Sequence, residues 1–202
     1  NMTLTVQTQE QALSEIHESD QVYNVTIDPV ADGITLSPTS SFGTEGDLIS
    51  LNLNAAIADP GETVTLVIKG LGEHAELYAK GARLTWTYNA AGQNEYTLTG
   101  LDQDQLDSLE FIQAADAISS PLQITAHTED GTDSSAPDNA NVTVNVSEVP
   151  ATSGNDALFY VEGNGLNGLG GTDTVNLRYG QDLDSGDYAN LSNIEAIELG
   201  VD

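Results

Sequence analysis

The residues with the clearest chemical spacing are the glycines of a loop in the last quarter of the sequence. Gly163, Gly165 and Gly168 have the spacing of a dinucleotide-binding turn, and the apolar, aromatic run 158–161 leads into them as a strand would. In such a turn a helix follows directly, and its N-terminal amides bind the pyrophosphate. Residues 172–177 instead have the Thr, Val and Leu pattern of a strand. The sequence therefore argues against a phosphate site.

The same loop has the residue types of a cation site. Segments 154–159 and 170–175 each resemble half of the RTX nonapeptide GGxGxDxLx, which puts Asp156 and Asp173 at the metal position. Glycines permit the left-handed backbone that turns carbonyl oxygens inward, while Asp and Asn add the side-chain oxygens that Ca²⁺ prefers. Two degenerate copies are too few for the stacked coils of a β-roll. One or two Ca²⁺ loops are expected, and a plain Gly/Asn turn is the alternative.

The overall charge also favours cations. Lys and Arg number 4 against 32 Asp and Glu, which gives a formal net charge of −28. A field of that sign repels nucleotides, nucleic acid and anionic membranes and attracts cations. With no Cys and only three His, the donors available favour Ca²⁺ over zinc or copper. The alternative is that the acidity only keeps the protein soluble, as in halophile-like or marine proteins.

Strands must position these loops, because period-two runs of β-branched residues recur along most of the chain. Examples are 22–27, 64–68 and 142–146, each bounded by Asx, Gly or Pro clusters. Helical periodicity is scarce, with single turns possible within 103–113 and 9–18. The fold class predicted is all-β, an antiparallel β-sandwich of cadherin or Ig type with an irregular, Ca²⁺-loop-containing β segment at its C-terminal end. No signal peptide or membrane span appears, and we interpret the chain as a piece of a longer protein.

An internal repeat suggests the domain boundaries. Residues 2–33 align with 121–154, each as a strand, an acidic turn, a Val/Thr strand and a Pro-containing acidic linker. Residues 30–149 then form one β-sandwich, and 150–202 form a ligand-binding segment of Ca²⁺ loops and strands. Residues 1–29 are either the closing strands of a preceding repeat or part of the same composite module.

A family resemblance accompanies these patterns. Its residues are "DPVADG" (28–33), "GTEGDLISLNLNAAIADPGETVTLVIKGL" (43–71), "LQITAHTEDG" (122–131) and the ending "LSNIEAIEL" (191–199). These resemble the tandem repeats and C-terminal block of giant, type I-secreted bacterial RTX adhesins. The resemblance implies Ca²⁺-stiffened modules on the cell surface, secretion to the exterior, and a Ca²⁺-dependent peptide-binding module near the distal end.

Candidate site residues follow from the loops and from the resemblance. Asp28 and Asp32 flank Pro29 in the linker, and Glu45 lies in the "GTEGD" turn; cadherin-like modules bind Ca²⁺ between such carboxylates, although two solvated turns would look the same. Tyrosines around the glycine loop would supply apolar walls for a ligand. The candidate metal ligands are Asp28, Asp32, Glu45, Asn155, Asp156, Glu162, Asn164, Asn167, Asp173 and Asp184. The candidate ligand-binding residues are Tyr160, Gly165, Gly168, Asp173, Tyr179 and Asp182.

Three functions remain open at this point. The favoured one is a Ca²⁺-dependent adhesion module, monomeric within a longer chain, that binds a peptide, protein or glycan on another cell surface. The second is a structural extender in which Ca²⁺ only stiffens junctions. The third is a glycan-active enzyme, which is disfavoured because no GxSxG, HExxH or Cys nucleophile is present. No nucleic acid partner and no membrane insertion are expected.

Overall fold

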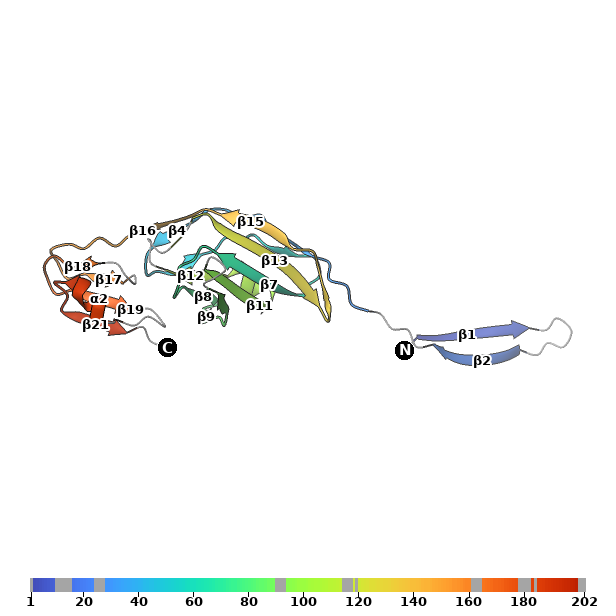
Figure 1. Cartoon of the computed structure of the whole chain (residues 1–202). Helices are drawn as coiled ribbons and strands as arrows, with labels where there is room; N and C mark the ends of the chain where they lie inside the picture. Colours follow the sequence, from blue (N-terminus) through green and yellow to red (C-terminus); the bar gives the residue numbers. More distant parts are fainter. Residues whose placement is uncertain are drawn as a thin grey trace. The chain divides into compact units, whose positions relative to one another are not determined.

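The computed structural model describes residues 2–9, 16–23, 28–89, 94–113, 118, 120–160, 165–177, 183 and 185–199. Strands dominate these ranges, so the predicted all-β sandwich class is confirmed. The chain separates into two compact units, Asn1–Val30 and Ala31–Asp202. In the first unit, β1 (Met2–Gln9) and β2 (Ile16–Tyr23) form an antiparallel ribbon (Figure 1).

The larger sheet of the second unit is centred on β7 (Thr63–Lys69) and β13 (Leu122–Asp130). Alternate residues of both strands are buried, and they meet across the ladder, as Leu66 does with Ala126. This period-two burial gives one apolar face to the sheet. The remaining strands of the sheet are β10 (Thr87–Asn89), β11 (Glu95–Leu101), β14 (Asp133–Ser134) and β15 (Asp138–Val142).

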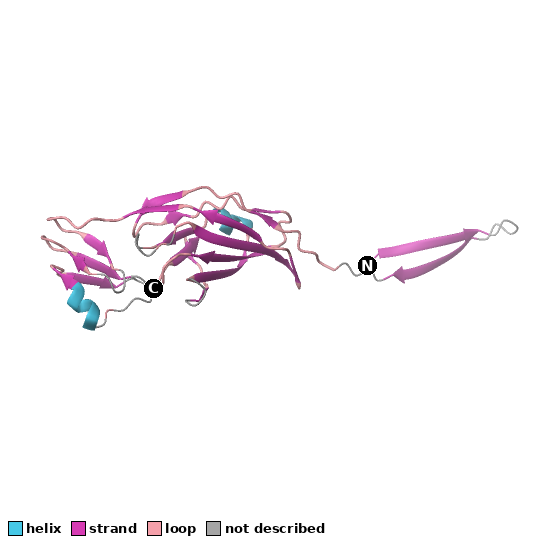
Figure 2. Cartoon of the chain, turned by 45° about the horizontal axis from the view of Figure 1, so that its top comes forward, coloured by secondary structure: helices cyan, strands magenta, loops and turns pink. Residues whose placement is uncertain are grey.

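A second, smaller sheet covers that apolar face. Phe111 on its strand β12 lies opposite Ile49 on one side and Leu77 on the other, and all three side chains are buried in the core shared by the two sheets. The two layers form the sandwich, with few helical residues (Figure 2). The strands of this sheet are β5 (Ile49–Ser50), β8 (Glu76–Ala79), β9 (Ala82–Arg83) and β12 (Glu110–Ile112).

One helical turn and two short strand pairs complete the sandwich. The turn α1 (Gln103–Asp107) lies where the sequence predicts one, with Asp102 as its N-cap in a capping box. The strand β4 (Ser41–Thr44) pairs in parallel with β16 (Val144–Ser147), which carries the chain out of the sandwich. The other pair joins β3 (Ile34–Thr35) to β6 (Ala56–Ile57).

The C-terminal segment is more regular than the sequence suggests. The strands β17 (Ala157–Phe159), β19 (Thr174–Leu177) and β21 (Ala196–Leu199) form one parallel sheet. Between them, β18 (Leu166–Asn167) pairs in parallel with β20 (Leu191–Ser192), which follows the short helix α2 (Ser185–Asn190). The chain thus passes from one small sheet to the other and back, as in a coil.

This coiled arrangement corrects the expectation of isolated loops without stacked coils. Tyr160, Val175 and Leu177 form a small core of their own, and Leu166, Leu191 and other apolar side chains pack against it. The third strand of the parallel sheet comes from the "LSNIEAIEL" ending, which lacks the glycine signature of the first two coils. Stacking successive coils buries side chains that one coil alone would leave exposed.

Candidate functional site

Three acidic residues occupy equivalent positions in successive coils. Asp156, Asp173 and Glu195 each directly precede a strand of the parallel sheet, namely β17, β19 and β21. Asp173 Oδ1 accepts a hydrogen bond from the Asp156 N–H at 2.9 Å, and Glu195 Oε2 accepts one from the Asp173 N–H at 2.7 Å. The Asp173 and Glu195 carboxylates therefore each hold the backbone of the preceding coil, and we call Asp156, Asp173 and Glu195 the acid ladder.

Asp173 is the most deeply buried member of the acid ladder. Its side chain is 0% exposed, and its second carboxylate oxygen, Oδ2, has no hydrogen-bond partner among the described residues. A Cβ placed on Gly168 would overlap both this oxygen and the Asn193 carbonyl oxygen, so the two oxygens face the same point beside the glycine. Burying a carboxylate oxygen without a donor is costly unless a cation compensates it. The Asp173 environment is therefore suited to a cation.

Other oxygens predicted as metal ligands in this region already accept hydrogen bonds. The Asp156 carboxylate accepts from the Thr152 N–H at 2.6 Å and from its hydroxyl at 3.0 Å. Asn155 Oδ1 accepts from the Thr172 N–H at 2.9 Å. These side chains close the turns of the coil, which is the role that Asx side chains commonly take in tight turns.

Asn167 has a similar role on the opposite side of the coil. Its Oδ1 accepts from the Leu169 N–H at 2.9 Å and from the Asn193 side-chain amide at 2.8 Å. The Gly168 N–H donates to the Ser192 carbonyl oxygen at 3.0 Å, so Gly168 belongs to the coil backbone that faces Asp173. Leu169 and Asn193 have φ angles of 68° and 52°, so both turns use left-handed backbone at residues other than glycine.

Several predicted residues cannot be placed. Glu162, Asn164, Tyr179, Asp182 and Asp184 lie outside the described residues. Within the described ranges, no group of three or more His, Cys, Asp or Glu side chains is arranged to hold a metal ion. Among the described residues of the coil, Asp173 is the carboxylate whose surroundings fit a cation.

The carboxylates predicted in the linker and in the "GTEGD" turn are divided between the two units of the chain. Asp28 is exposed and belongs to the first unit, whereas Asp32 belongs to the second. The Asp32 N–H donates to Glu62 Oε1 at 2.6 Å, at the end of the sandwich that also holds the β13–β14 hairpin. Glu62 is 3% exposed, and over the described stretches of the chain its Oε2 has no hydrogen-bond partner; the sequence carries no sign that this acid is buried.

Glu45 lies at the other end of the sandwich, next to the exit of β16. Its backbone N–H donates to the Ser147 carbonyl oxygen at 2.9 Å, and its Oε1 accepts from the Val149 N–H at 2.6 Å. The carboxylate is 9% exposed. Glu45 thus holds the chain where it leaves the sandwich after β16.

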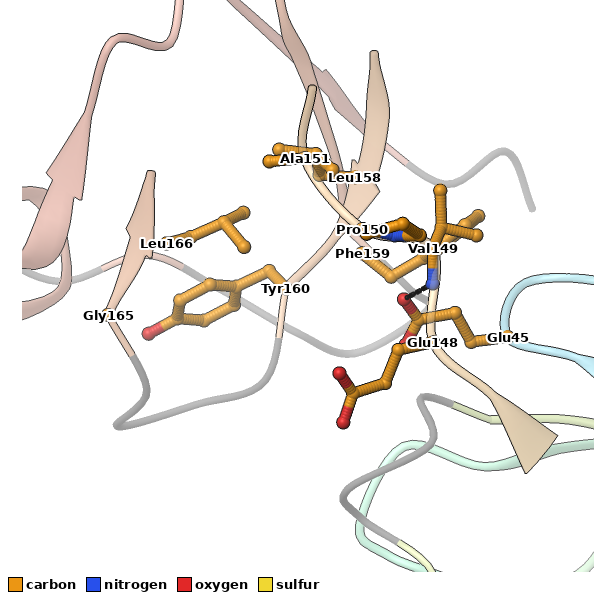
Figure 3. A pocket seen from close by; sticks show the side chains of 10 residues that line it. All are labelled: Glu45, Glu148, Val149, Pro150, Ala151, Leu158, Phe159, Tyr160, Gly165 and Leu166. Atoms are coloured by element: carbon orange, nitrogen blue, oxygen red, sulfur yellow. Dashed lines mark hydrogen bonds between the residues drawn. The ribbon is translucent and has the colours of Figure 1, made fainter. Parts of the chain in front are cut away.

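A pocket of about 390 Å³ opens between this end of the sandwich and the coil (Figure 3). Glu45, Glu148 and Pro150 line it from the sandwich side and the connecting segment, and Phe159 and Leu166 line it from the coil. Its volume lies within the range of about 300–1,000 Å³ that is usual for small-ligand sites. We call this the junction pocket.

Two predicted ligand-binding residues, Tyr160 and Gly165, also line the junction pocket. Tyr160 is 1% exposed, and its hydroxyl donates to the carboxylate of Asp187, the buried acid of α2. The ring therefore forms part of the pocket floor and ties α2 to the coil. From the sequence, Asp187 is one acid of an acidic turn that could contribute ligands, and nothing local shows that it is buried in a helix.

Comparison with known proteins adds nothing to these observations: no family model, curated protein or solved structure matches the chain. In the part of the chain that the structure describes, no helix is both long enough and apolar enough to span a membrane.

Proposed function

We propose that the chain is a Ca²⁺-dependent ligand-binding module of a bacterial surface adhesin, and that it binds the C-terminal end of a peptide or protein on another cell. The observation that carries the proposal is the buried Asp173 carboxylate. Its Oδ2 has no donor in the part of the chain that the structure describes, and it faces the same point as the Asn193 carbonyl oxygen. A buried carboxylate oxygen beside a backbone carbonyl oxygen, in a protein with a net charge of −28, provides the first two ligands of a cation site.

In this proposal Asp173 Oδ2 and the Asn193 carbonyl oxygen hold the Ca²⁺ ion, together with other oxygens of the glycine loop. A bound Ca²⁺ ion would supply the local positive charge that an acidic surface otherwise lacks. Such a charge is needed to attract a carboxylate against the field of the whole protein. The resemblance of residues 154–175 to RTX repeats supports the same ion.

The alternative is a structural extender in which Ca²⁺ only stiffens the coil. The hydrogen bonds of Asp156 and Asn155 favour it, because these oxygens serve the backbone turns rather than a ligand. The junction pocket favours the binding module, because an extender requires no pocket beside its coil. A glycan-binding module remains a further possibility, and a glycan array on the same protein distinguishes it.

The test is binding of an immobilised peptide library, in millimolar Ca²⁺ and again in excess EGTA. We expect free-acid peptides to bind in Ca²⁺, and the same peptides with amidated C-termini to bind at least tenfold more weakly. EGTA should abolish binding of the free acids. Equal binding of acids and amides would contradict carboxylate capture, and binding that survives EGTA would contradict the role of the ion.

Asp173→Asn provides the matched variant, because it keeps the oxygen that accepts the Asp156 N–H and removes only the negative charge. We expect this variant to lose Ca²⁺-dependent peptide binding while retaining the circular dichroism spectrum of the parent. Asp133→Asn is the control. Asp133 lies in β14, in the hairpin that follows β13, so this variant removes one charge outside the coil and should bind like the parent.

A further inference from the structure

The junction pocket combines acidic and apolar walls in a way that the proposed carboxylate site does not use. Glu45 is nine-tenths buried, whereas Glu148 is exposed, and Figure 3 shows both on the sandwich side of the pocket. Phe159 and Leu166 line the pocket from the coil, and Pro150 adds apolar surface from the connecting segment. A ligand that fills this pocket meets two carboxylates and an apolar surface together.

The protein's described basic residues are engaged elsewhere. Lys69 lies 3.0 Å from Glu95, Lys80 lies 3.0 Å from Asp104, and Arg83 lies 4.0 Å from Glu76. None of the three basic residues lines the junction pocket. Because Glu45 is largely shielded from water, its attraction for a positive group is screened less than that of a surface acid.

The apolar wall favours an organic cation over a metal ion. A Ca²⁺ ion takes about six to eight oxygen ligands, and Glu45 already uses Oε1 to accept the Val149 N–H. A hydrated metal ion would also gain nothing from Phe159 and Leu166. A lysine side chain satisfies both walls, since its aliphatic stem packs on apolar surface while its ammonium group reaches an acid.

We propose that the junction pocket binds the alkylammonium side chain of a lysine in an extended peptide. The stem lies against Phe159 and Leu166, and the ammonium group donates hydrogen bonds to the Glu45 and Glu148 carboxylates. This inference rests on the proposed function, in that the chain binds peptides, and it adds a second specificity: a basic residue in the peptide, recognised without Ca²⁺.

The test uses a labelled five-residue peptide with a central lysine between two leucines, acetylated at the N-terminus and amidated at the C-terminus. Fluorescence polarisation measures its binding in Ca²⁺ buffer and again in EGTA. We expect saturable binding in both, and at least tenfold weaker binding when the lysine is Nε-acetylated, because acetylation removes the charge. Equal binding of the two peptides would overturn the inference.

Substitutions of Glu45 and Glu148 test whether the lysine peptide binds in the junction pocket. Glu148→Gln should weaken binding about threefold, because this exposed charge is screened by water. Glu45→Gln should weaken it about tenfold, and the glutamine keeps a carbonyl oxygen for the Val149 N–H. The matched control is Glu129→Gln, which removes the same charge at the far end of β13 and should leave the dissociation constant unchanged. If Glu148→Gln and Glu129→Gln bind the lysine peptide equally, the pocket is not its site.

The same assay tests whether the ammonium group belongs to a peptide or to a free amine. It also tests whether the junction pocket binds its ligand independently of the carboxylate site. Cadaverine, a free diamine, should displace the lysine peptide only at much higher concentration; displacement at equal concentration would overturn the assignment to a peptide. The amidated peptide lacks the carboxylate that the Ca²⁺ site requires. If the amidated lysine peptide does not bind while free-acid peptides do, only the lysine inference fails. If the lysine peptide binds while free-acid peptides do not, only the proposed carboxylate site fails.

Discussion

At the residue scale, Asp173 and Asp156 differ in how their carboxylates are satisfied, although the sequence gives them the same place in the repeat. Both oxygens of Asp156 accept hydrogen bonds from Thr152. Asp173 uses one oxygen for the Asp156 N–H and buries the other, which has no partner in the described part of the chain. An unmet buried acceptor costs about 1–3 kcal/mol. Asp173 is therefore the position where a cation has the most to stabilise.

This difference predicts opposite effects of one substitution at the two sites. In EGTA, Asp173→Asn should raise the free energy of unfolding by about 1–2 kcal/mol, because its amide brings a donor toward the Asn193 carbonyl oxygen. Asp156→Asn replaces a carboxylate that already accepts hydrogen bonds, and it should lower the free energy of unfolding or leave that free energy unchanged. Urea titrations in EGTA measure both values. A less stable Asp173→Asn variant would show that Oδ2 is compensated in another way.

Tyr96 provides a pH-dependent prediction in the core of the sandwich. Burial raises the pKa of its hydroxyl far above the ordinary value of 10.0, while the hydroxyl donates to the Gly72 carbonyl oxygen at 2.6 Å and accepts the Ala75 N–H at 3.0 Å. The folded state thus holds this proton more tightly than the unfolded chain. The contribution to stability is complete below about pH 10 and decreases as the pH rises above it.

We therefore expect the free energy of unfolding to decrease above pH 10, and Tyr96→Phe to make this decrease shallower. At neutral pH the same variant should be about 1–2 kcal/mol less stable, because the Ala75 N–H and Gly72 carbonyl lose their partner. Urea titrations at pH 7 and at pH 10.5 measure both effects. An identical pH dependence in the variant would exclude Tyr96 as the titrating group.

At the element scale, the sandwich and the coil meet where the β4–β5 turn contacts β17. Gly46 has a φ of 82°, and a Cβ there would overlap the ring of Phe159. Glycine is thus required twice, for the left-handed backbone and for the space that the ring occupies. The contact places the first strand of the coil directly against the sandwich, beside the junction pocket.

Gly46→Ala should therefore cost more than backbone strain alone. Gly81 has a φ of 72° and open space around it, so Gly81→Ala carries only the strain, about 1 kcal/mol. We expect Gly46→Ala to cost at least about 1 kcal/mol more, and Phe159→Ala in the same chain to recover that excess. Urea denaturation of the single and double variants measures it. If Gly46→Ala and Gly81→Ala lowered the free energy of unfolding equally, Phe159 would not restrict the residue at position 46.

At the scale of the whole molecule, the net charge of −28 opposes compaction unless cations neutralise part of it. Sodium chloride screens this repulsion gradually, whereas a specific Ca²⁺ site saturates. Ligand at about 100 times its dissociation constant adds about 2.7 kcal/mol to stability. For a chain of this length that corresponds to a rise of about 5–10 °C in Tm.

We expect this rise between EGTA and millimolar Ca²⁺, measured by scanning calorimetry at fixed ionic strength. Mg²⁺ at the same concentration is the control for charge alone, because it prefers a rigid octahedral site and retains its water. A Tm that responds equally to both ions would indicate general screening. A Tm that responds to neither ion would contradict the proposed Ca²⁺ dependence.

The sequence by itself determined that strands dominate the chain. The period-two runs of β-branched residues at 64–68 and 142–146 are local patterns, and strands lie at both, in β7 and across the end of β15 and β16. The same local reasoning identified Asp173 as a candidate ligand and α1 as a helical turn. Each of these predictions depends only on residues that are close together in the sequence.

Only the tertiary structure decided which of the many acids come together, and with what. The Glu45 carboxylate accepts the N–H of Val149, which is 104 residues away, and Glu195 completes the acid ladder from a segment without glycine. The coil stacks because β21 supplies a third parallel strand in register with β19. Strand register and coil stacking depend on packing between distant segments, and in a chain with 32 acids no local pattern distinguishes a buried carboxylate from an exposed one.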